Sequence, residues 1–119
     1  MRPKQSVGQA MSIALRGMFL LFNERSFRIQ MTIGIMVTAL GFYVNLEPWA
    51  WMAQNIAIGL VLMAEGINTA IERLADVVQP EYDEKIGRIK DMSAGFVSIA
   101  ALTAFVIAAI IYAPKLGLV

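Results

Sequence analysis

The sequence predicts an all-α membrane protein, with one amphipathic surface helix followed by three transmembrane helices in a single membrane domain over residues 1–119. Hydrophobic residues make up 58% of the 119 positions and charged residues only 16%. A soluble domain of this length has too little interior to bury so much apolar surface. Three apolar segments are long enough to supply the spans.

The N-terminal segment, residues 5–22, predicts an amphipathic helix lying in the membrane surface. Its polar residues recur at helical spacing, and apolar residues fill the opposite face. The polar face holds Gln5, Ser6, Gln9, Ser12 and Arg16, and the apolar face holds Val7, Ala10, Met11, Ala14, Met18, Leu21 and Phe22. The alternative is a helix packed on the edge of the bundle.

The three spans are expected at residues 27–46, 48–78 and 88–113. A turn ending at Pro48 separates the first two, and proline suits the first turn of a helix. The second helix continues to Val78 and stops before Gln79-Pro80. Its length of roughly 45 Å exceeds the hydrocarbon layer of ~30 Å, so its last turns should stand out into the cytoplasm.

The distribution of Lys and Arg predicts the orientation. Nine of the ten basic residues lie in residues 2–28 or 73–90, at one end of the predicted spans, and only Lys115 lies at the other end. By the positive-inside rule, the N-terminus and the 73–90 region are cytoplasmic.

Composition also limits the chemistry. A net charge of +1 argues against a nucleic-acid partner. The chain has no Cys and no His, which excludes thiol catalysis and imidazole bases. Catalysis would have to use carboxylates, amides, hydroxyls, Lys and Arg, and the expected metal is a hard ion such as Mg²⁺.

The second helix carries a polar stripe at its cytoplasmic end, made of Glu65, Asn68, Glu72 and Asp76. Their spacing places all four within about 80° on one face. Glu65 is about 25 Å from the helix start, near the inner headgroups, and Glu72 is about 10 Å further out. A carboxylate at that depth is costly unless it faces a protein interior or a polar cleft. One alternative is that the stripe only holds helices together, with Asp76 paired to Arg73 or Arg25.

Two further polar clusters, at residues 23–28 and 81–91, are expected at the same height. Such charges commonly just flank a span. Together with the stripe, however, their carboxylates and Lys90 are suited to hold Mg²⁺ and a polyphosphate. No P-loop or soluble-kinase motif is present.

The residues AEGINTAIE at 64–72, followed by Asp76, Pro80-Glu81-Tyr82 and Lys90-Asp91-Met92, carry a specific resemblance. Together with Asn23-Glu24 and Phe27-Arg28, they make the chain similar to the prokaryotic diacylglycerol kinase family, which includes the undecaprenol kinases. The resemblance covers about residues 12 to 113. It implies a homotrimer in the bacterial cytoplasmic (inner) membrane, with active sites shared between subunits and a γ-phosphoryl transfer from MgATP to a lipid alcohol.

The resemblance also implies residue roles. Glu65 would be the catalytic base, with Asn68 beside it, and Glu24 and Glu72 would hold Mg²⁺. The nucleotide would be contacted by Glu24, Glu72, Glu81, Tyr82, Lys90 and Asp91. The lipid would be contacted by Ser26, Phe27, Arg28, Gln30 and Glu65.

The acceptor lipid is open between two alternatives. Residues 24–29 and 58–62 resemble the undecaprenol kinases, whereas residues 84–93 are closer to the diacylglycerol kinases. The longer match favours diacylglycerol, with phosphatidic acid as product. The rival class is a non-catalytic membrane protein, either a small exporter subunit or an assembly factor. Small exporters of this length usually have four spans and a single acid near mid-membrane.

Overall fold

The computed structural model describes residues 3–119, and within that range the chain is entirely helical. The helices are α1 (Val7–Leu21), α2 (Arg25–Tyr43), α3 (Pro48–Val78) and α4 (Glu84–Lys115). The predicted all-α class is therefore confirmed. Arg2, counted in the charge asymmetry, lies outside the described residues.

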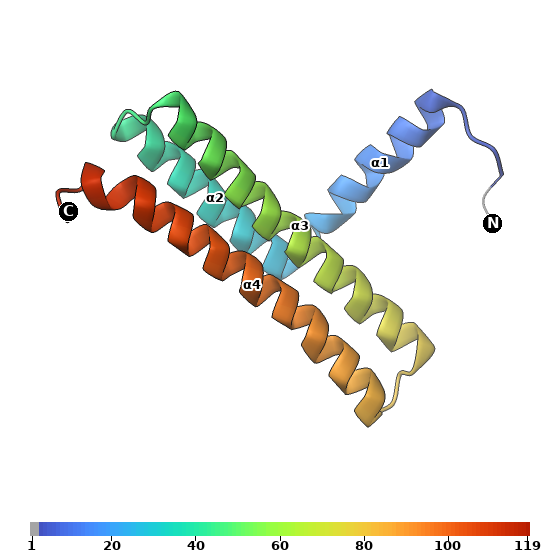
Figure 1. The fold of residues 1–119 in the computed structure, drawn as a ribbon. Coiled ribbons are helices and arrows are strands. Elements are labelled where there is room, and N and C mark those ends of the chain that lie inside the picture. The colour runs from blue at the N-terminus through green and yellow to red at the C-terminus, as the bar shows by residue number, and fades with distance from the viewer. Residues whose placement is uncertain (1–2) are drawn as a thin grey trace.

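The first helix projects away from the other three (Figure 1). It begins at Val7, two residues later than expected, because Ser6 is its N-cap. The Ser6 hydroxyl accepts a hydrogen bond from the Gln9 amide, and the Gln9 side chain accepts one from the Ser6 amide. This reciprocal capping satisfies amides that would otherwise be unpaired at the helix end. No residue of α1 is buried, and the helix meets the bundle at its C-terminal end, where Leu21 lies against Gly66.

Helices α2, α3 and α4 lie side by side (Figure 1). In the antiparallel register of α3 and α4, Asp76 pairs with Lys90 at one end and Gln54 with Tyr112 at the other. In the register of α2 and α3, Gly34 lies against Ile58. Extending this register places the first turn of α2 level with Glu65, so α3 and α4 continue past α2 as a two-helix arm.

The end of the bundle opposite that arm is tightly closed. After α2, Asn45 adopts a left-handed conformation with φ of 56°. The amides of Asn45 and Leu46 then donate to the carbonyl oxygens of Phe42 and Gly41, which is the hydrogen-bond pattern of a Schellman cap. Leu46 is buried there in a cluster with Ala50, Ile111 and Tyr112.

Two helices among residues 3–119, α3 and α4, are both long and apolar enough to cross a membrane. Helix α2 has 19 residues. It is not among these helices, because Arg28 and Gln30 in its first turns lower its hydropathy. The structure thus shows two of the three predicted spans as membrane-crossing candidates.

Candidate functional site

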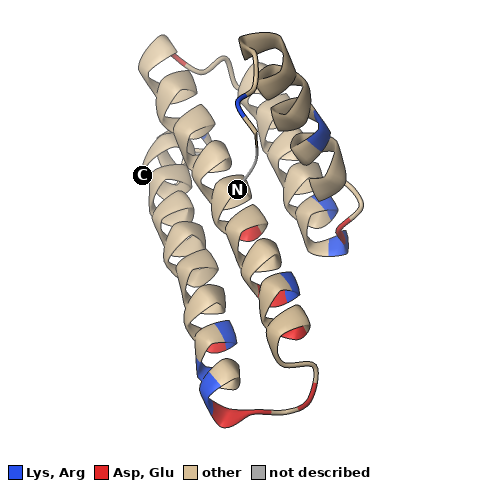
Figure 2. Cartoon of the chain, turned by 90° about the vertical axis from the view of Figure 1, so that its right-hand side faces the viewer, with Lys and Arg blue, Asp and Glu red and all other residues tan. Residues whose placement is uncertain are grey.

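Charged residues gather at the end of the bundle where α3 and α4 are joined (Figure 2). At the opposite end, the charged side chains among the described residues are Glu47 and Lys115, which pair with each other at 2.8 Å. All the candidate residues on α3, α4 and the connecting loop lie at or near the charged end. Because opposite charges can neutralise one another there, the individual contacts decide which groups are available to a ligand.

The stripe on α3 divides into a buried pair and an exposed pair. The exposed fraction is 6% for Glu65 and 9% for Asn68, whereas Glu72 and Asp76 are exposed. The Asn68 amide donates to Glu72 Oε1 at 3.2 Å, and its own Oδ1 is buried without a hydrogen-bond partner. Within residues 3–119, no side-chain hydrogen bond or ion pair engages the Glu65 carboxylate. The buried Asn68 Oδ1 atom and the accessible Glu65 carboxylate are therefore both free to accept a hydrogen bond.

Two ion pairs join α3 to its neighbours. Arg73 binds Glu24 at the junction of α1 and α2, and Lys90 on α4 binds Asp76. The expected alternative, in which Asp76 pairs with Arg73 or Arg25, is wrong because Lys90 occupies the Asp76 carboxylate. Asp76 and Lys90 fix the α3–α4 arm, while Arg73 and Glu24 close one side of a cleft next to Thr69.

The two predicted metal ligands, Glu24 and Glu72, each have a partner in the chain. Glu24 is held by Arg73, Glu72 by Asn68, and no group of three acidic residues surrounds a common point in the described part of the chain. The donor set still suits Mg²⁺, which is commonly held by one or two carboxylates together with substrate phosphates. Both residues are carboxylates, and Glu72 is exposed, which leaves its side chain accessible to a nucleotide. Their joint metal site stays a prediction.

The predicted nucleotide residues are spread over the arm. Glu81, Tyr82 and Asp91 are exposed, and Tyr82 retains 90% of its surface. Beside them, Asp83 caps α4 by accepting from the amides of Lys85 and Ile86, at 2.9 and 3.1 Å. One chain does not bring Glu81 or Tyr82 into contact with Glu65.

The predicted lipid-contacting residues have different surroundings. Phe27 is buried and packs edge-on against Phe22, with 5.3 Å between ring centroids. The Arg28 guanidinium donates to the Phe22 carbonyl oxygen at 2.9 Å. Both side chains therefore stabilise the α1–α2 junction. Ser26 is exposed, and Gln30 is half-buried.

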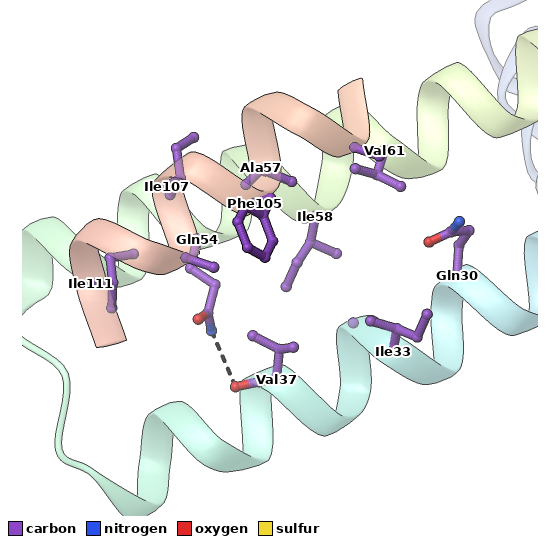
Figure 3. A pocket seen from close by; sticks show the side chains of 14 residues that line it. Gln30, Ile33, Val37, Gln54, Ala57, Ile58, Val61, Phe105, Ile107 and Ile111 are labelled. Atoms are coloured by element: carbon purple, nitrogen blue, oxygen red, sulfur yellow. Dashed lines mark hydrogen bonds between the residues drawn. The ribbon is translucent and has the colours of Figure 1, made fainter. Parts of the chain in front are cut away.

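Gln30 also lines an apolar groove of about 260 Å³ between α2, α3 and α4 (Figure 3). Its α3 wall is formed by Gln54, Ala57, Ile58 and Val61. At the closed end, Gln54 Nε2 lies 3.5 Å from the Val37 carbonyl oxygen, and the Tyr112 hydroxyl contacts both Gln54 Oε1 and that same oxygen. These hydrogen bonds satisfy the polar groups of Gln54 and Tyr112, so few donors or acceptors at this end of the groove are left to bind a ligand.

Sequence reasoning missed several of these groups. Arg73 was considered only as a partner of Asp76, and Tyr112 was treated as part of an apolar span. Ser93, with 1% of its surface exposed and its hydroxyl unpaired, was likewise not singled out. In the sequence, the only indication of the Gln54–Tyr112 hydrogen bond was that Gln54 is a polar residue within an apolar stretch of the second helix.

The structure thus defines a small helical bundle with two potentially membrane-crossing helices and an acidic site at one end. The sequence profile of the prokaryotic diacylglycerol kinase family matches residues 12–112. The chain belongs to this family, as its motifs predicted, and the prediction of an ATP-dependent lipid kinase is confirmed by the kinase names of its relatives.

Individual relatives carry two acceptor names. An undecaprenol kinase of Bacillus subtilis is 32% identical over 94 residues, which cover 79% of this chain and 76% of that protein. A diacylglycerol kinase of Synechocystis is 32% identical over 95 residues, or 79% of this chain and 54% of that protein. The diacylglycerol kinase of Escherichia coli K12 is 29% identical over 84 residues, covering 71% of this chain and 69% of that protein.

Proposed function

We propose that this protein transfers the γ-phosphoryl group of ATP to the hydroxyl of diacylglycerol, giving phosphatidic acid. The observation that carries the proposal is Glu65, whose side chain is largely buried while its carboxylate stays accessible and is engaged by no other side chain within the described residues. It lies level with the first turn of α2, next to the polar arm. A lipid hydroxyl at the headgroup boundary and a nucleotide from the cytoplasm can both approach this point.

In this reaction, Glu65 accepts the proton of the lipid hydroxyl as its oxygen bonds to the γ-phosphorus. The bond from phosphorus to the β–γ bridging oxygen breaks, and ADP leaves. Asn68 supports this step because its free Oδ1 can accept a hydrogen bond beside Glu65. Phosphoryl transfer depends mainly on in-line positioning and charge stabilisation, so few groups are required.

The remaining polar residues would bind the nucleotide. Mg²⁺ at Glu24 and Glu72 would neutralise phosphate charge. Lys90 would provide a point charge for a phosphate oxygen, exchanging its contact with Asp76. Exposed Glu81, Tyr82 and Asp91 would contact the rest of the nucleotide.

The proposed setting is a homotrimer in the bacterial inner membrane, with three spans per subunit and the N-terminus and arm cytoplasmic. Exposed apolar side chains on each of α2, α3 and α4 support both membrane and subunit contacts. Sharing of sites between subunits would also bring Glu81 and Tyr82 to a neighbour's Glu65.

The acceptor has a second candidate, undecaprenol. Gln30 favours diacylglycerol, because the register of α2 on α3 places its amide about one turn below Glu65, where a glycerol ester would lie. The relative from Bacillus subtilis and the otherwise apolar groove favour undecaprenol.

A competition assay tests the proposal. The purified protein is incubated with radiolabelled ATP, Mg²⁺ and equal surface densities of dioleoylglycerol and undecaprenol. Dioleoylglycerol should be labelled preferentially. A clear preference for undecaprenol would transfer the assignment to the second candidate, and no labelled lipid would contradict both.

A further inference from the structure

Arg73 is the single basic residue of α3, and it lines the cleft between that helix and the junction of α1 and α2. The polar side chains of this cleft are Asn23, Glu24, Thr69 and Arg73. The proposed function uses Glu24 as a metal ligand and leaves Arg73 only as its ion-pair partner. The level, exposure and bonding of the Arg73 guanidinium indicate a further role.

The ion pair with Glu24 determines the level of the guanidinium along the bundle. In the register of α2 on α3, Glu24 is level with Asn68. Arg73 comes five residues after Asn68, and its side chain reaches back to Glu24 because helix side chains tilt toward the N-terminus of their helix. The guanidinium is therefore held about 5 Å beyond the level of Glu65, on the side of Glu72.

Most of the hydrogen-bonding capacity of this guanidinium is unused. A guanidinium carries five N–H donors in one plane. Within residues 3–119, its one side-chain partner is Glu24 Oε1, which is bonded through Nη2. The Arg73 side chain is 70% exposed, compared with 24% for Glu24. Arg73 can therefore keep its bond to Glu24 and bind a second anion at the same time.

The alternative is that Arg73 only links α3 to the α1–α2 junction. An ion pair with an exposed arginine stabilises a protein little, because water screens the charges and a long side chain loses its freedom. The junction also contacts α3 without this pair, since Leu21 lies against Gly66. A structural link alone therefore explains the position of Arg73 poorly.

The anion expected at this level is the phosphoryl group that is transferred. A lipid hydroxyl at Glu65 must lie in line with the γ-phosphorus, so the γ-phosphate lies just beyond Glu65 on the cytoplasmic side. Lys90 is bonded to Asp76, about 12 Å further along the arm than the Arg73 guanidinium. Lys90 is thus suited to phosphates nearer the adenosine, and Arg73 to the terminal phosphate.

We propose that Arg73 binds the γ-phosphate of the nucleotide and holds it beside Glu65 while keeping its bond to Glu24. The inference rests on the proposed function, because that function places the lipid hydroxyl at Glu65. Two N–H groups of one guanidinium can donate to two phosphate oxygens in parallel. This contact stabilises the charge on the phosphoryl oxygens during transfer.

The test measures dissociation constants for the Mg²⁺ complexes of ADP and of β,γ-imido-ATP, an analogue that is not turned over. Arg73→Gln should weaken binding of the analogue at least about tenfold, because charge-assisted hydrogen bonds to the terminal phosphate are lost. It should leave binding of ADP nearly unchanged. Arg25→Gln is the matched control, since Arg25 is an exposed arginine next to Glu24 that does not line the cleft, and it should change neither constant.

A purely structural Arg73 would give a different result. Loss of the link between α3 and the α1–α2 junction would weaken both nucleotides alike, or neither, and either result would overturn the assignment. Arg73→Lys is a second variant, in which an ion pair with Glu24 is still possible. It should also weaken the analogue more than ADP, because an ammonium group does not present paired donors in one plane.

Chemical modification of the wild-type protein does not depend on the folding of a variant. Phenylglyoxal modifies accessible guanidinium groups, and mass spectrometry of peptides reports the modification of each arginine. The Mg²⁺ complex of the analogue should protect Arg73 and leave Arg25 reactive, and ADP should protect Arg73 less. Micelles that contain phosphatidylglycerol and no nucleotide test a lipid phosphate as the ligand. Protection of Arg73 by this lipid but not by the analogue would overturn the assignment.

The outcomes also separate this inference from the proposed function. If the wild-type protein labels no lipid from radiolabelled ATP, the proposed function fails and the Arg73 assignment fails with it. If it labels lipid but Arg73→Gln keeps the wild-type preference for the analogue over ADP, only the Arg73 assignment is overturned.

Discussion

Burial separates the carboxylates of α3 by what each can do. Asp76 is exposed and already paired with Lys90, and Glu72 is exposed and bonded to Asn68. Glu65 is buried and is not engaged by another side chain within residues 3–119. A carboxylate whose side chain is largely buried, but whose oxygens remain accessible and unpaired, is placed to act on a ligand rather than to hold two helices together.

Replacing Glu65 with Gln tests its role as base. The amide keeps the shape of the side chain but does not accept the hydroxyl proton, so turnover should fall at least ~100-fold. The KM for ATP should change little. The matched control is Glu84→Gln, because Glu84 is an exposed acid paired with Arg88 on its own helix. A near-normal kcat in Glu65→Gln would contradict the role of Glu65 as base and would favour a purely structural role for the polar stripe on α3.

The ion pair of Glu24 with Arg73 makes the metal prediction more specific. Glu24→Gln and Glu72→Gln should each raise the Mg²⁺ concentration needed for half-maximal activity, and the double variant should be little worse than the worse single one. Arg73→Gln breaks the same ion pair but keeps both carboxylates, so it should leave the Mg²⁺ requirement unchanged. Additive losses, or an equal effect of Arg73→Gln, would show that Glu24 acts through structure alone.

At the level of the helices, the sequence predicted a helix boundary best where a nearby residue, such as a proline, determines it. Pro48 at the start of α3 and Gln79-Pro80 after its end mark its boundaries, and the structure places the helix at Pro48–Val78. Helix α2 begins two residues before the expected span, at Arg25, and ends three before its expected end, at Tyr43. The early end at Tyr43 has a local reason, because the cap formed by Asn45 and Leu46 ends α2 before the turn.

Side-chain partners across helices were less predictable. Periodicity gives the face on which a residue lies but does not give the register between two helices. The pairs Asp76 with Lys90 and Gln54 with Tyr112 depend on that register, as does the path of the groove. The roles proposed for Phe27 and Arg28 came from motif matching, whereas their contacts at the α1–α2 junction depend on the position of Phe22.

At the closed end of the bundle, the space beside Gly41 is filled by the side chains of Trp51 and Leu46. A Cβ added there would lie 2.8 Å from the Trp51 ring and 2.9 Å from Leu46. Gly41→Ala should therefore lower the midpoint of thermal inactivation, because overpacking costs about 1–3 kcal/mol and outweighs the gain in helix propensity. Gly59→Ala is the control, since its added Cβ meets no atom within 4 Å. An unchanged midpoint for Gly41→Ala would contradict this packing.

The Glu47–Lys115 contact gives the same end a pH dependence. The hydrogen bond from the Lys115 ammonium lowers the pKa of Glu47 below its ordinary value of 4.5. A lowered folded pKa means that the contribution to stability is complete above about pH 4.5 and is lost as the pH falls through the folded pKa. Midpoints of Glu47→Gln and wild type should differ at pH 6 and converge on acidification. A constant difference down to pH 3 would exclude this linkage.

For the whole molecule, composition and charge asymmetry predicted a helical protein with its charges at one end, and Figure 2 shows that distribution. Assembly could not be derived from composition, because exposed apolar surface is equally suited to lipid and to another subunit. The number of spans depends on α2, which packs antiparallel to α3 although its first turns are polar.

Labelling of single cysteines tests that topology, and the chain is suited to it because it contains no native Cys. If α2 crosses the membrane, Lys4→Cys and Lys85→Cys should both react with an impermeant maleimide only from the cytoplasmic side, and Leu118→Cys only from the other side. If α2 does not cross, residue 4 lies on the same side as residue 118, since only α3 and α4 then span. Reaction of Lys4→Cys and Leu118→Cys from one side would therefore reject the three-span arrangement, and with it the placement of α1 beside the proposed active site.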